Sequence, residues 1–237
     1  MILFLDCAAG LSGDMLLAGF LDMGLPLGRL RQVLDQLGLG KIRIRVERVR
    51  RDGVKAVRIS VSGGSRYSPQ PAQRLIRFVK ESRLDSSMKR SIGQVLEALA
   101  RAEGAAHGLP WRNAIFHQLA RPDTLVDLAG FCAGLRHFRI DAVHTSAVPI
   151  GCCYQDPHGV WRRRPGPAVQ RLLSRFPMVR LDEPFEWATP TGAALLASFA
   201  SAAPSPPFQI FRIGHGIGHR SSAQGPATLR LLLGRPI

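Results

Sequence analysis

The turn that follows the first apolar segment most constrains what this chain can fold into. Residues 1–5 are apolar enough for a buried strand, and the ten residues from Asp6 to Met15 (DCAAGLSGDM) follow without a break. The two glycines of this run relax the backbone, and Ser12 can cap a helix that runs from Asp14. The pattern predicts a strand that turns directly into a helix, with small, hydroxyl and carboxyl side chains at the turn.

Local chemistry leaves two interpretations of this turn open. In the simpler one, Ser12 and Asp14 only stabilise the start of the helix, which is the usual role of such residues. In the other, the free amides at the helix N-terminus, Gly13 included, attract a phosphate, and Asp6 and Asp14 supply oxygen ligands for a metal ion. The second interpretation predicts a site for a charged ligand.

Composition favours an ordinary soluble globular protein. The 237 residues suffice for one substantial core or two small ones, and no apolar run approaches the roughly 20 residues of a membrane helix. The net charge of +15 suits nucleic acid, an anionic membrane or a phosphorylated small molecule as partner. Because the arginines are scattered and no basic run alternates with aromatic residues, we expect a solvated basic surface, no nucleic-acid partner and no membrane.

The cysteines and the N-terminus indicate the cellular compartment. The four cysteines, at positions 7, 132, 152 and 153, show no CxxC spacing, so they predict neither a structural zinc site nor a disulfide framework. The N-terminus lacks the basic segment and cleavage site of a secretory signal. We expect reduced thiols and a cytoplasmic protein.

Hydrophobic periodicity predicts both helices and strands along the rest of the chain. Apolar alternation on both sides of Asp52-Gly53 is typical of a β-hairpin, and residues 63–71 are typical of a linker. The predicted helices span residues 16–23, 27–37, 72–82, 86–107, 123–135, 168–175 and 193–202, and the predicted strands span residues 1–5, 42–49, 54–61, 142–150, 178–181, 208–214 and 228–233.

These elements predict an α/β fold, namely a mixed sheet with flanking helices and an inserted region of β-hairpin plus helix pair. We expect one α/β domain over residues 1–237. Within it, residues 1–64 hold the opening α/β part and the hairpin, residues 70–110 the helix pair, and residues 111–237 the second α/β part. Ligand-binding groups are expected at the carboxyl ends of the strands.

A histidine and two aspartates form a second candidate site. Asp123 and Asp127 lie four residues apart, so a helix that starts near Pro122 places both on one face near its positive end. His117, at the end of the preceding apolar segment, would then complete a nitrogen and oxygen site for a divalent cation. The alternative is that Asp123 helps to cap the helix and His117 is a packed core imidazole.

A third candidate is the ATPTG segment, in which Thr189, Thr191 and Gly192 precede a helix rich in Ala and Leu. Hydroxyls and free amides at a helix N-terminus suit a phosphate, and a plain helix cap is the alternative. His158, which precedes a glycine in a loop, is expected to be exposed. Residues 214–220 (GHGIGHR) look like a metal or phosphate motif, but no helix follows them, so we predict a glycine-rich turn between strands.

A series of motifs resembles the LarC family, the nickel-insertion proteins of the lactate racemase system. The run from Asp6 to Met15 is similar to the DxxxGxSGDM motif with which the family opens. The other matches, all in the family's order, are residues 106–108 (AHG), 116–117 (FH), 123–127 (DTLVD), 149–151 (PIG), 158–159 (HG), 165–168 (PGPA), 189–194 (TPTGAA) and 229–234 (LRLLLG).

The resemblance implies a nickel chelatase that acts on pyridinium-3,5-bisthiocarboxylic acid mononucleotide and forms the nickel-pincer nucleotide. It implies Ni(II) as the metal, and Mn(II) or Mg(II) with CTP in the same reaction. Carried onto this sequence, it implies catalytic roles for Asp6, Asp14 and His117, a metal cluster of His117, Asp123 and Asp127, and a nucleotide site of Ser12, Gly13, His158, Thr189, Thr191 and Gly192.

The chain departs from the family pattern at several positions. Ile115 and Gln118 stand where the family has a His and a Glu, and residues 65–69 stand where the family carries a histidine-rich stretch. These departures favour an alternative, a relative that has lost catalysis and binds a nucleotide or a protein partner without metal chemistry. The family's C-terminal domain does not follow Ile237, so the resemblance leaves room for a separately encoded C-terminal partner and for a homo-oligomer.

Overall fold

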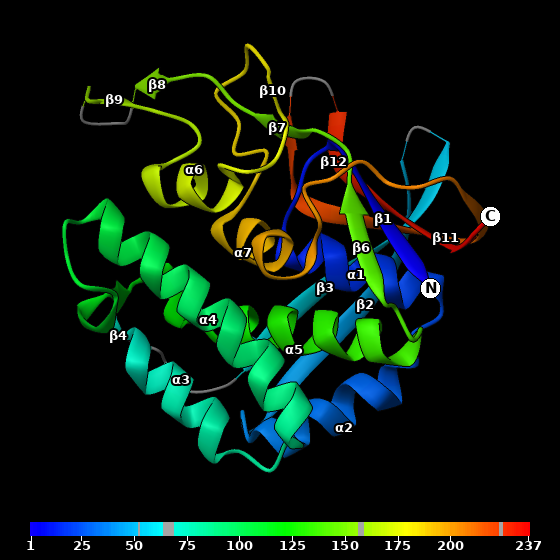
Figure 1. The fold of residues 1–237 in the computed structure, drawn as a ribbon, viewed down its shortest axis with the longest axis horizontal. Helices are drawn as coiled ribbons and strands as arrows, with labels where there is room; N and C mark the ends of the chain where they lie inside the picture. Colours follow the sequence, from blue (N-terminus) through cyan, green and yellow to red (C-terminus); the bar gives the residue numbers. More distant parts are fainter. Residues whose placement is uncertain (52, 64–68, 156–158, 223–224) are drawn as a thin grey trace.

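The computed structural model confirms the predicted α/β class, because a mixed sheet is flanked by helices (Figure 1). The structure describes residues 1–51, 53–63, 69–155, 159–222 and 225–237. Its strands are β1 (Ile2–Ala9), β2 (Ile42–Arg51), β3 (Val54–Gly63), β4 (Gln70–Pro71), β5 (Ile115–Phe116), β6 (Ala142–Thr145), β7 (Val148–Ile150), β8 (Tyr154–Gln155), β9 (Trp161–Arg162), β10 (Met178–Arg180), β11 (Phe208–Ser222) and β12 (Gly225–Pro236).

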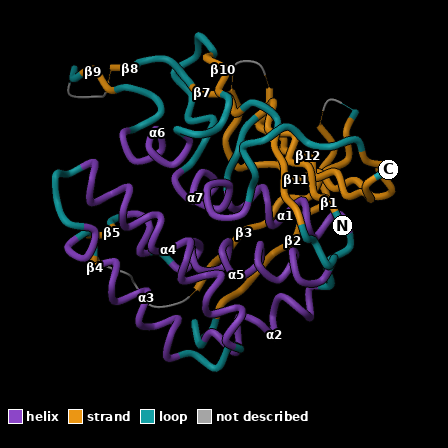
Figure 2. Tube along the Cα trace, in the orientation of Figure 1, coloured by secondary structure: helices purple, strands orange, loops and turns teal. Residues whose placement is uncertain are grey.

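The helices gather on one side of the main strand layer (Figure 2). None of the described helices is long and apolar enough to cross a membrane. The α-helices are α1 (Gly13–Met23), α2 (Leu27–Leu37), α3 (Ala72–Glu81), α4 (Ser86–Ala106), α5 (Pro122–His137), α6 (Pro167–Leu173) and α7 (Pro190–Phe199), and two short 3₁₀ turns are η1 (Trp111–Asn113) and η2 (Gln118–Ala120).

The main sheet has six strands in the order β2-β3-β11-β12-β1-β6, and β1 lies between β12 and β6. Leu3 lies opposite Leu233 in the antiparallel ladder with β12 and opposite Val143 in the parallel ladder with β6. Alternate side chains of β1, those of Leu3, Leu5 and Cys7, are fully buried in the core beneath the helices. Because β1 is paired on both sides, the turn that follows it starts from a fixed position.

The predicted hairpin is confirmed. Strands β2 and β3 pair antiparallel along their whole length, and Arg51 lies opposite Val54 at the turn. Gly53 has a φ of +81°, a left-handed conformation that favours glycine. Asp52 lies outside the described residues. The hairpin joins the main sheet where Val57 of β3 pairs with Gly216 of β11.

Helix α1 packs closely on α5 because two glycines of α5 leave room for its side chains. A Cβ atom added to Gly130 would lie 2.5 Å from Leu17, and one added to Gly134 would lie 2.5 Å from Phe20. Phe20 also meets Phe131 edge to face, with ring centroids 5.5 Å apart. This packing places the start of α1 beside Asp127 of α5.

Residues 214–220 do not form the turn that we predicted, because they lie inside the long strand β11. Their glycines serve packing instead. A Cβ added to Gly214 would lie 2.1 Å from the Gly19 carbonyl oxygen, and one added to Gly216 would lie 1.8 Å from the Met15 carbonyl oxygen. The glycines therefore let α1 lie directly on the backbone of β11.

The predicted strand over residues 142–150 is also wrong, because the chain leaves the main sheet partway along it. At Ser146 the backbone amide donates to the Leu5 carbonyl and the side-chain hydroxyl accepts from the Cys7 amide, at 3.0 and 2.9 Å. Strand β6 ends there, and β7 pairs with β10 in a separate two-stranded sheet.

The predicted linker over residues 63–71 is partly ordered into a strand. Gln70 and Pro71 form β4 and pair with β5, whereas residues 64–68 lie outside the described part of the chain. The predicted helix pair that follows is confirmed as α3 and α4. Asp85 caps α4 by accepting from the amides of Ser87 and Met88, both at 3.0 Å.

Substitution of Gly216 by Ala should destabilise the protein by about 3 kcal/mol, because the new methyl group meets the backbone of α1 and must displace it. Gly93→Ala is the matched control. Gly93 lies within α4 with nothing near its missing Cβ, so alanine there should be neutral or stabilise the helix by up to about 1 kcal/mol. Urea unfolding of both variants measures the difference, and equal midpoints would contradict this account of the β11 glycines.

Candidate functional site

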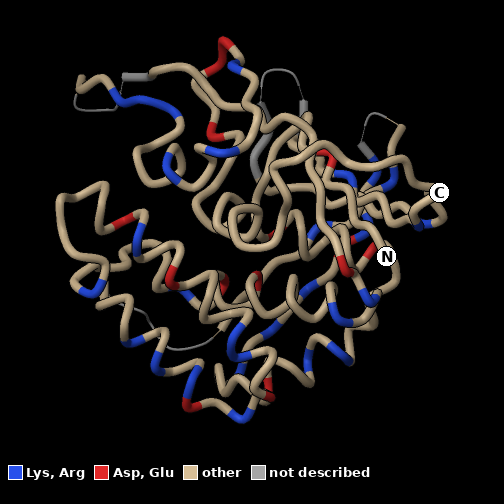
Figure 3. Tube along the Cα trace, viewed as in Figure 1, with Lys and Arg blue, Asp and Glu red and all other residues tan. Residues whose placement is uncertain are grey.

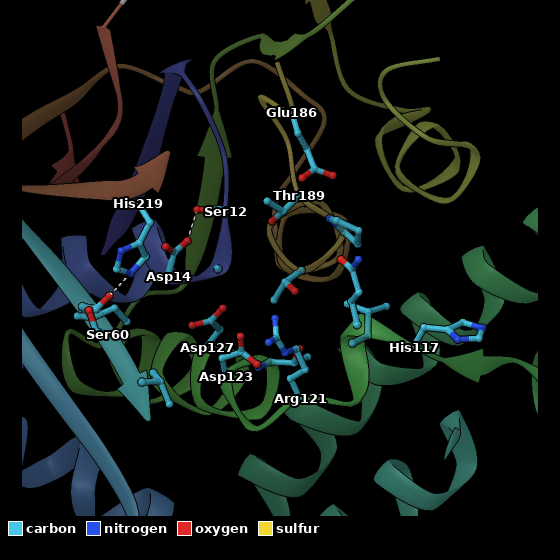
Figure 4. Close-up of a pocket in the computed structure, with 18 of the residues that line it drawn as sticks. Ser12, Asp14, Ser60, His117, Arg121, Asp123, Asp127, Glu186, Thr189 and His219 are labelled. Atoms are coloured by element: carbon cyan, nitrogen blue, oxygen red, sulfur yellow. Dashed lines mark hydrogen bonds between the residues drawn. The ribbon is translucent and has the colours of Figure 1, made fainter. Parts of the chain in front are cut away.

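A cavity of about 640 Å³ lies where the N-termini of α1 and α7 face the start of α5 (Figure 4). Strands β3 and β11 and the end of α4 close its sides. The cavity is lined by Ser12, Gly13, Asp14, Ile59, Ser60, Val61, Glu103, His117, Gln118, Leu119, Arg121, Asp123, Thr124, Asp127, Glu186, Thr189, Pro190, Thr191 and His219.

Two helix N-termini meet at this cavity because their preceding loops are hydrogen-bonded to each other. The Leu11 amide donates to the Trp187 carbonyl at 2.7 Å, and the Thr189 amide donates to the Leu11 carbonyl at 2.9 Å. Gly192 makes the approach possible, because a Cβ there would lie 2.8 Å from both the Leu11 oxygen and the Ser12 Cα. The loops before α1 and α7, about 180 residues apart in sequence, thus lie side by side at one end of the cavity.

The caps predicted at both helix starts are confirmed. Ser12 is the N-cap of α1 and accepts from the Met15 amide at 3.4 Å, and Thr189 is the N-cap of α7 and accepts from the Gly192 amide at 3.2 Å. The Ser12 hydroxyl also donates to Asp14. Capping leaves other first-turn amides of both helices available to an anion.

Asp127 is the most unusual side chain of the cavity. It reaches from α5 to the start of α1, where its Oδ2 would lie 2.5 Å from a Cβ on Gly13, so only glycine fits there. The residue is 8% exposed, and its Oδ1 has no hydrogen-bond partner among the described residues. Burial, followed by the negative charges of Asp14 and Asp123, raises the pKa of Asp127 well above its ordinary value.

The charge of the cavity is opposite to that of the protein. Its lining includes five carboxylates, from Asp14, Glu103, Asp123, Asp127 and Glu186, and one Lys or Arg side chain, that of Arg121. The whole chain has 32 Lys and Arg against 17 Asp and Glu, and the basic residues are spread over its outer elements (Figure 3). A cluster of carboxylates in a partly enclosed cavity attracts cations, so the site suits a metal ion or a cationic ring.

Most of the predicted site residues line this one cavity, including Ser12, Gly13, Asp14, Asp123, Asp127, Thr189 and Thr191. Three do not. Asp6 lies on the sheet, where its carboxylate accepts from Nε of Arg230 at 2.8 Å. Gly192 packs behind the lining, and His158 lies outside the described residues.

His117 lines the cavity but is not brought to the two aspartates of its predicted cluster. In Figure 4 its ring points away from Asp123 and Asp127. It lies instead within electrostatic reach of Glu103, where burial raises the pKa of Glu103 and the charges of His107 and His117 lower it. The 3₁₀ turn η2 separates His117 from α5, so the histidine and the aspartates leave the backbone in different directions.

No three His, Cys, Asp or Glu side chains within the described ranges stand together in an arrangement that could hold a metal ion. The negative charges of Asp14 and Asp123 both act on Asp127. The predicted cluster with His117 is therefore not formed in this conformation, and the role of each residue stays a prediction.

Sequence reasoning did not select several polar residues of the lining, among them Ser60, Glu103, Arg121, Glu186 and His219. His219 contacts the Ile59 carbonyl oxygen through Nε2 at 2.7 Å, and Glu186 is paired with Arg164 at 3.1 Å. The GHGIGHR motif of residues 214–220 is a sequence signal for His219, but a turn at this place would not bring its side chain to the cavity. A strand at this place brings it to the cavity edge.

Comparisons with known proteins point to one family. A family model described as "Nickel insertion protein" matches residues 3–236. The chain is 31% identical to the "Pyridinium-3,5-bisthiocarboxylic acid mononucleotide nickel insertion protein" of Geobacillus kaustophilus (strain HTA426), and 34% and 36% identical to proteins of Geotalea daltonii and a Synechococcus strain that also have nickel insertion in their names.

These alignments cover 98%, 98% and 99% of this chain and 59%, 60% and 60% of the three relatives. The chain thus spans about three fifths of the length of the relatives it matches. No solved structure matches the chain.

The raised pKa of Asp127 predicts how stability depends on pH. As pH rises above the ordinary value of 3.8, the unfolded chain loses this proton while the folded chain keeps it, so the free energy of unfolding falls. Asp127→Asn removes this fall in the free energy of unfolding, because the amide does not titrate. We expect the variant to gain stability relative to the unchanged protein as pH rises from 3.8 toward the raised pKa of the folded state, by at most about 1.4 kcal/mol per pH unit.

Urea unfolding at a series of pH values, in the presence of a chelator, measures this difference. Asp182→Asn is the control, since that side chain is 91% exposed. Curves for the Asp127 variant and the unchanged protein that stay parallel over the whole range would show that the carboxyl group keeps an ordinary pKa.

Proposed function

The chain belongs to the nickel insertion protein family, and we propose that it inserts Ni²⁺ into pyridinium-3,5-bisthiocarboxylic acid mononucleotide to form the nickel-pincer nucleotide. In this proposal the nickel ion is a substrate that passes through the site. The pyridinium mononucleotide, which carries a phosphate, is the second substrate.

The observation that carries the proposal is the Oδ1 atom of Asp127, buried without a hydrogen-bond partner in the wall of an acidic cavity. Such an atom is costly to the folded protein unless a proton or a cation meets it. Arrival of a divalent ion would displace the proton from Asp127, and Asp14 and Asp123 lie close enough to share the charge.

The same cavity offers separate places for the two ends of the nucleotide. First-turn amides of α1 and α7 suit its phosphate, and the carboxylates suit the cationic pyridinium ring and the metal. The two thiocarboxylates then offer sulfur donors, which compete well with oxygen for a late first-row metal such as nickel. In the proposed reaction, Ni²⁺ is transferred by ligand exchange from protein carboxylates to substrate sulfur.

We include CTP with Mn(II) or Mg(II) in the proposal. The cavity wall supplies hard oxygen donors, namely carboxylates with the hydroxyls of Ser12 and Thr191, and such donors fit either ion. When bound, the ion would neutralise phosphate charge. Asp14 and Asp123 would hold it, and Arg121, the cation of the lining, would orient the phosphate chain.

A second candidate function is nucleotide or protein binding without metal chemistry. It is favoured by the position of His117, whose ring lies away from the aspartates, and by the neutral Gln118 beside it. Calorimetry with Ni²⁺, Mn²⁺ and CTP separates the two functions. Binding of CTP with no binding of either ion would support this second candidate.

We propose that a separate C-terminal partner, for which the family resemblance leaves room, takes part in the reaction. The purified chain is therefore assayed alone and together with such a polypeptide. Nickel incorporation into the mononucleotide, followed by mass spectrometry in the presence of CTP and Mn²⁺, measures the activity, and no incorporation under either condition would refute the proposal.

Asp127→Asn should lower nickel incorporation by about a hundredfold or more, because an amide of the same shape cannot neutralise the ion. Its circular dichroism should match that of the unchanged protein. Asp182→Asn, which removes an exposed carboxylate that is not part of the cavity lining, should retain full activity. Equal incorporation by the two variants would exclude Asp127 from the reaction.

A further inference from the structure

His219 lies at the cavity edge in a position that the proposed function leaves unused. It comes from β11 and lines the cavity together with Asp14 of α1 and Ser60 of β3. Figure 4 shows the ring beside Asp14, across the cavity from His117. The cavity thus has the imidazole of His219 on the side of Asp14, although the imidazole of His117, which we predicted as a metal ligand, points away.

The backbone determines which nitrogen of His219 is available. Nε2 lies 2.7 Å from the Ile59 carbonyl oxygen, and because a carbonyl only accepts, Nε2 must carry the hydrogen and donate it. In the neutral ring the lone pair then resides on Nδ1. A backbone carbonyl that holds one ring nitrogen while the other binds a metal is the usual arrangement of a histidine ligand.

Oxygen donors stand on the same side of the cavity. Asp14 accepts from the Ser12 hydroxyl through Oδ1, so its second oxygen is not used by that bond. Asp127 presents its buried, unpartnered Oδ1 from α5. Oxygen ligands alone favour ions such as Mg²⁺ and Ca²⁺, whereas an imidazole shifts the preference toward nickel and other late first-row metals.

Resting on the proposed function, we propose that Nδ1 of His219 is the nitrogen ligand that receives Ni²⁺ in this cavity, with Asp14 and Asp127 as oxygen ligands. As they stand, the described side chains do not form a three-ligand group. Binding therefore requires the side chains of Asp14 and Asp127 to turn toward Nδ1 of His219, while the hydrogen bond between Nε2 and the Ile59 carbonyl is kept.

His219→Gln tests this inference, because it removes the proposed metal-binding nitrogen and can keep the hydrogen bond to the Ile59 carbonyl. The glutamine Nε2 can still donate to the Ile59 carbonyl and keep β11 joined to β3, but the side chain offers an amide oxygen in place of the imidazole nitrogen, and that oxygen is a weaker ligand for nickel. Titration calorimetry of the purified protein with Ni²⁺ alone should show binding weakened by at least about tenfold, the lower range seen when groups that only orient metal ligands are removed.

The spectrum of bound Ni²⁺ provides a second readout that a structural role would not move. Loss of a nitrogen ligand in favour of water should shift the ligand-field bands to longer wavelength. Mg²⁺ binding should change little, since oxygen donors dominate it. His215→Gln is the matched control, because this residue lies on the same strand but contacts Asp22 outside the cavity lining, and its Ni²⁺ affinity should be unchanged.

The possible outcomes separate this inference from the proposed function. If His219→Gln and the unchanged protein bind Ni²⁺ equally and with equal spectra, or if the unchanged protein binds no Ni²⁺, the inference is overturned. The nickel incorporation assay then decides independently on the proposed function. Weaker binding and shifted bands in His219→Gln, with neither change in His215→Gln, would support the inference.

Discussion

The direct contact of helix α1 with its neighbours is the constraint on which the rest of the structure depends. Gly214 and Gly216 of β11 let the backbone of α1 lie on the strand, and Gly130 and Gly134 of α5 admit its Leu and Phe side chains from the other side. Because interiors are close-packed, a helix held this way cannot slide. The position of its first residue, Gly13, against the carboxylate of Asp127 follows from that packing.

The acidic side chains that surround Asp127 lower the free energy of unfolding of the protein. A carboxyl group buried beside two other acids raises the free energy of the folded state whenever it is ionised, and the rest of the core must offset that cost. From the direction of this pKa shift, an uncharged side chain of equal size is expected to be more stable here. Sites that trade stability for reactivity in this way are typical of binding and catalytic centres, so the cost itself points to function.

Sequence patterns predicted the parts of the site that local chemistry determines. The caps at Ser12 and Thr189 follow from residue type and position, and the hairpin follows from alternation around a glycine turn. The predictions that were wrong concerned elements whose structure depends on contacts between distant segments. The exit of the chain from the sheet at Ser146 is fixed by hydrogen bonds to β1, and residues 214–217 form a strand because they pair with β12.

His117 and His219 also show that local sequence does not predict which distant segments meet in the site. His117 precedes two aspartates in sequence, yet the turn η2 directs it elsewhere, whereas His219 is about 90 residues away from them and lies beside Asp14. In the proposed reaction this distribution has a chemical consequence. Two carboxylates and one imidazole from three separate elements hold nickel less firmly than a set of thiolates would, so a substrate with two sulfur donors can remove the ion, and transfer runs from protein to nucleotide.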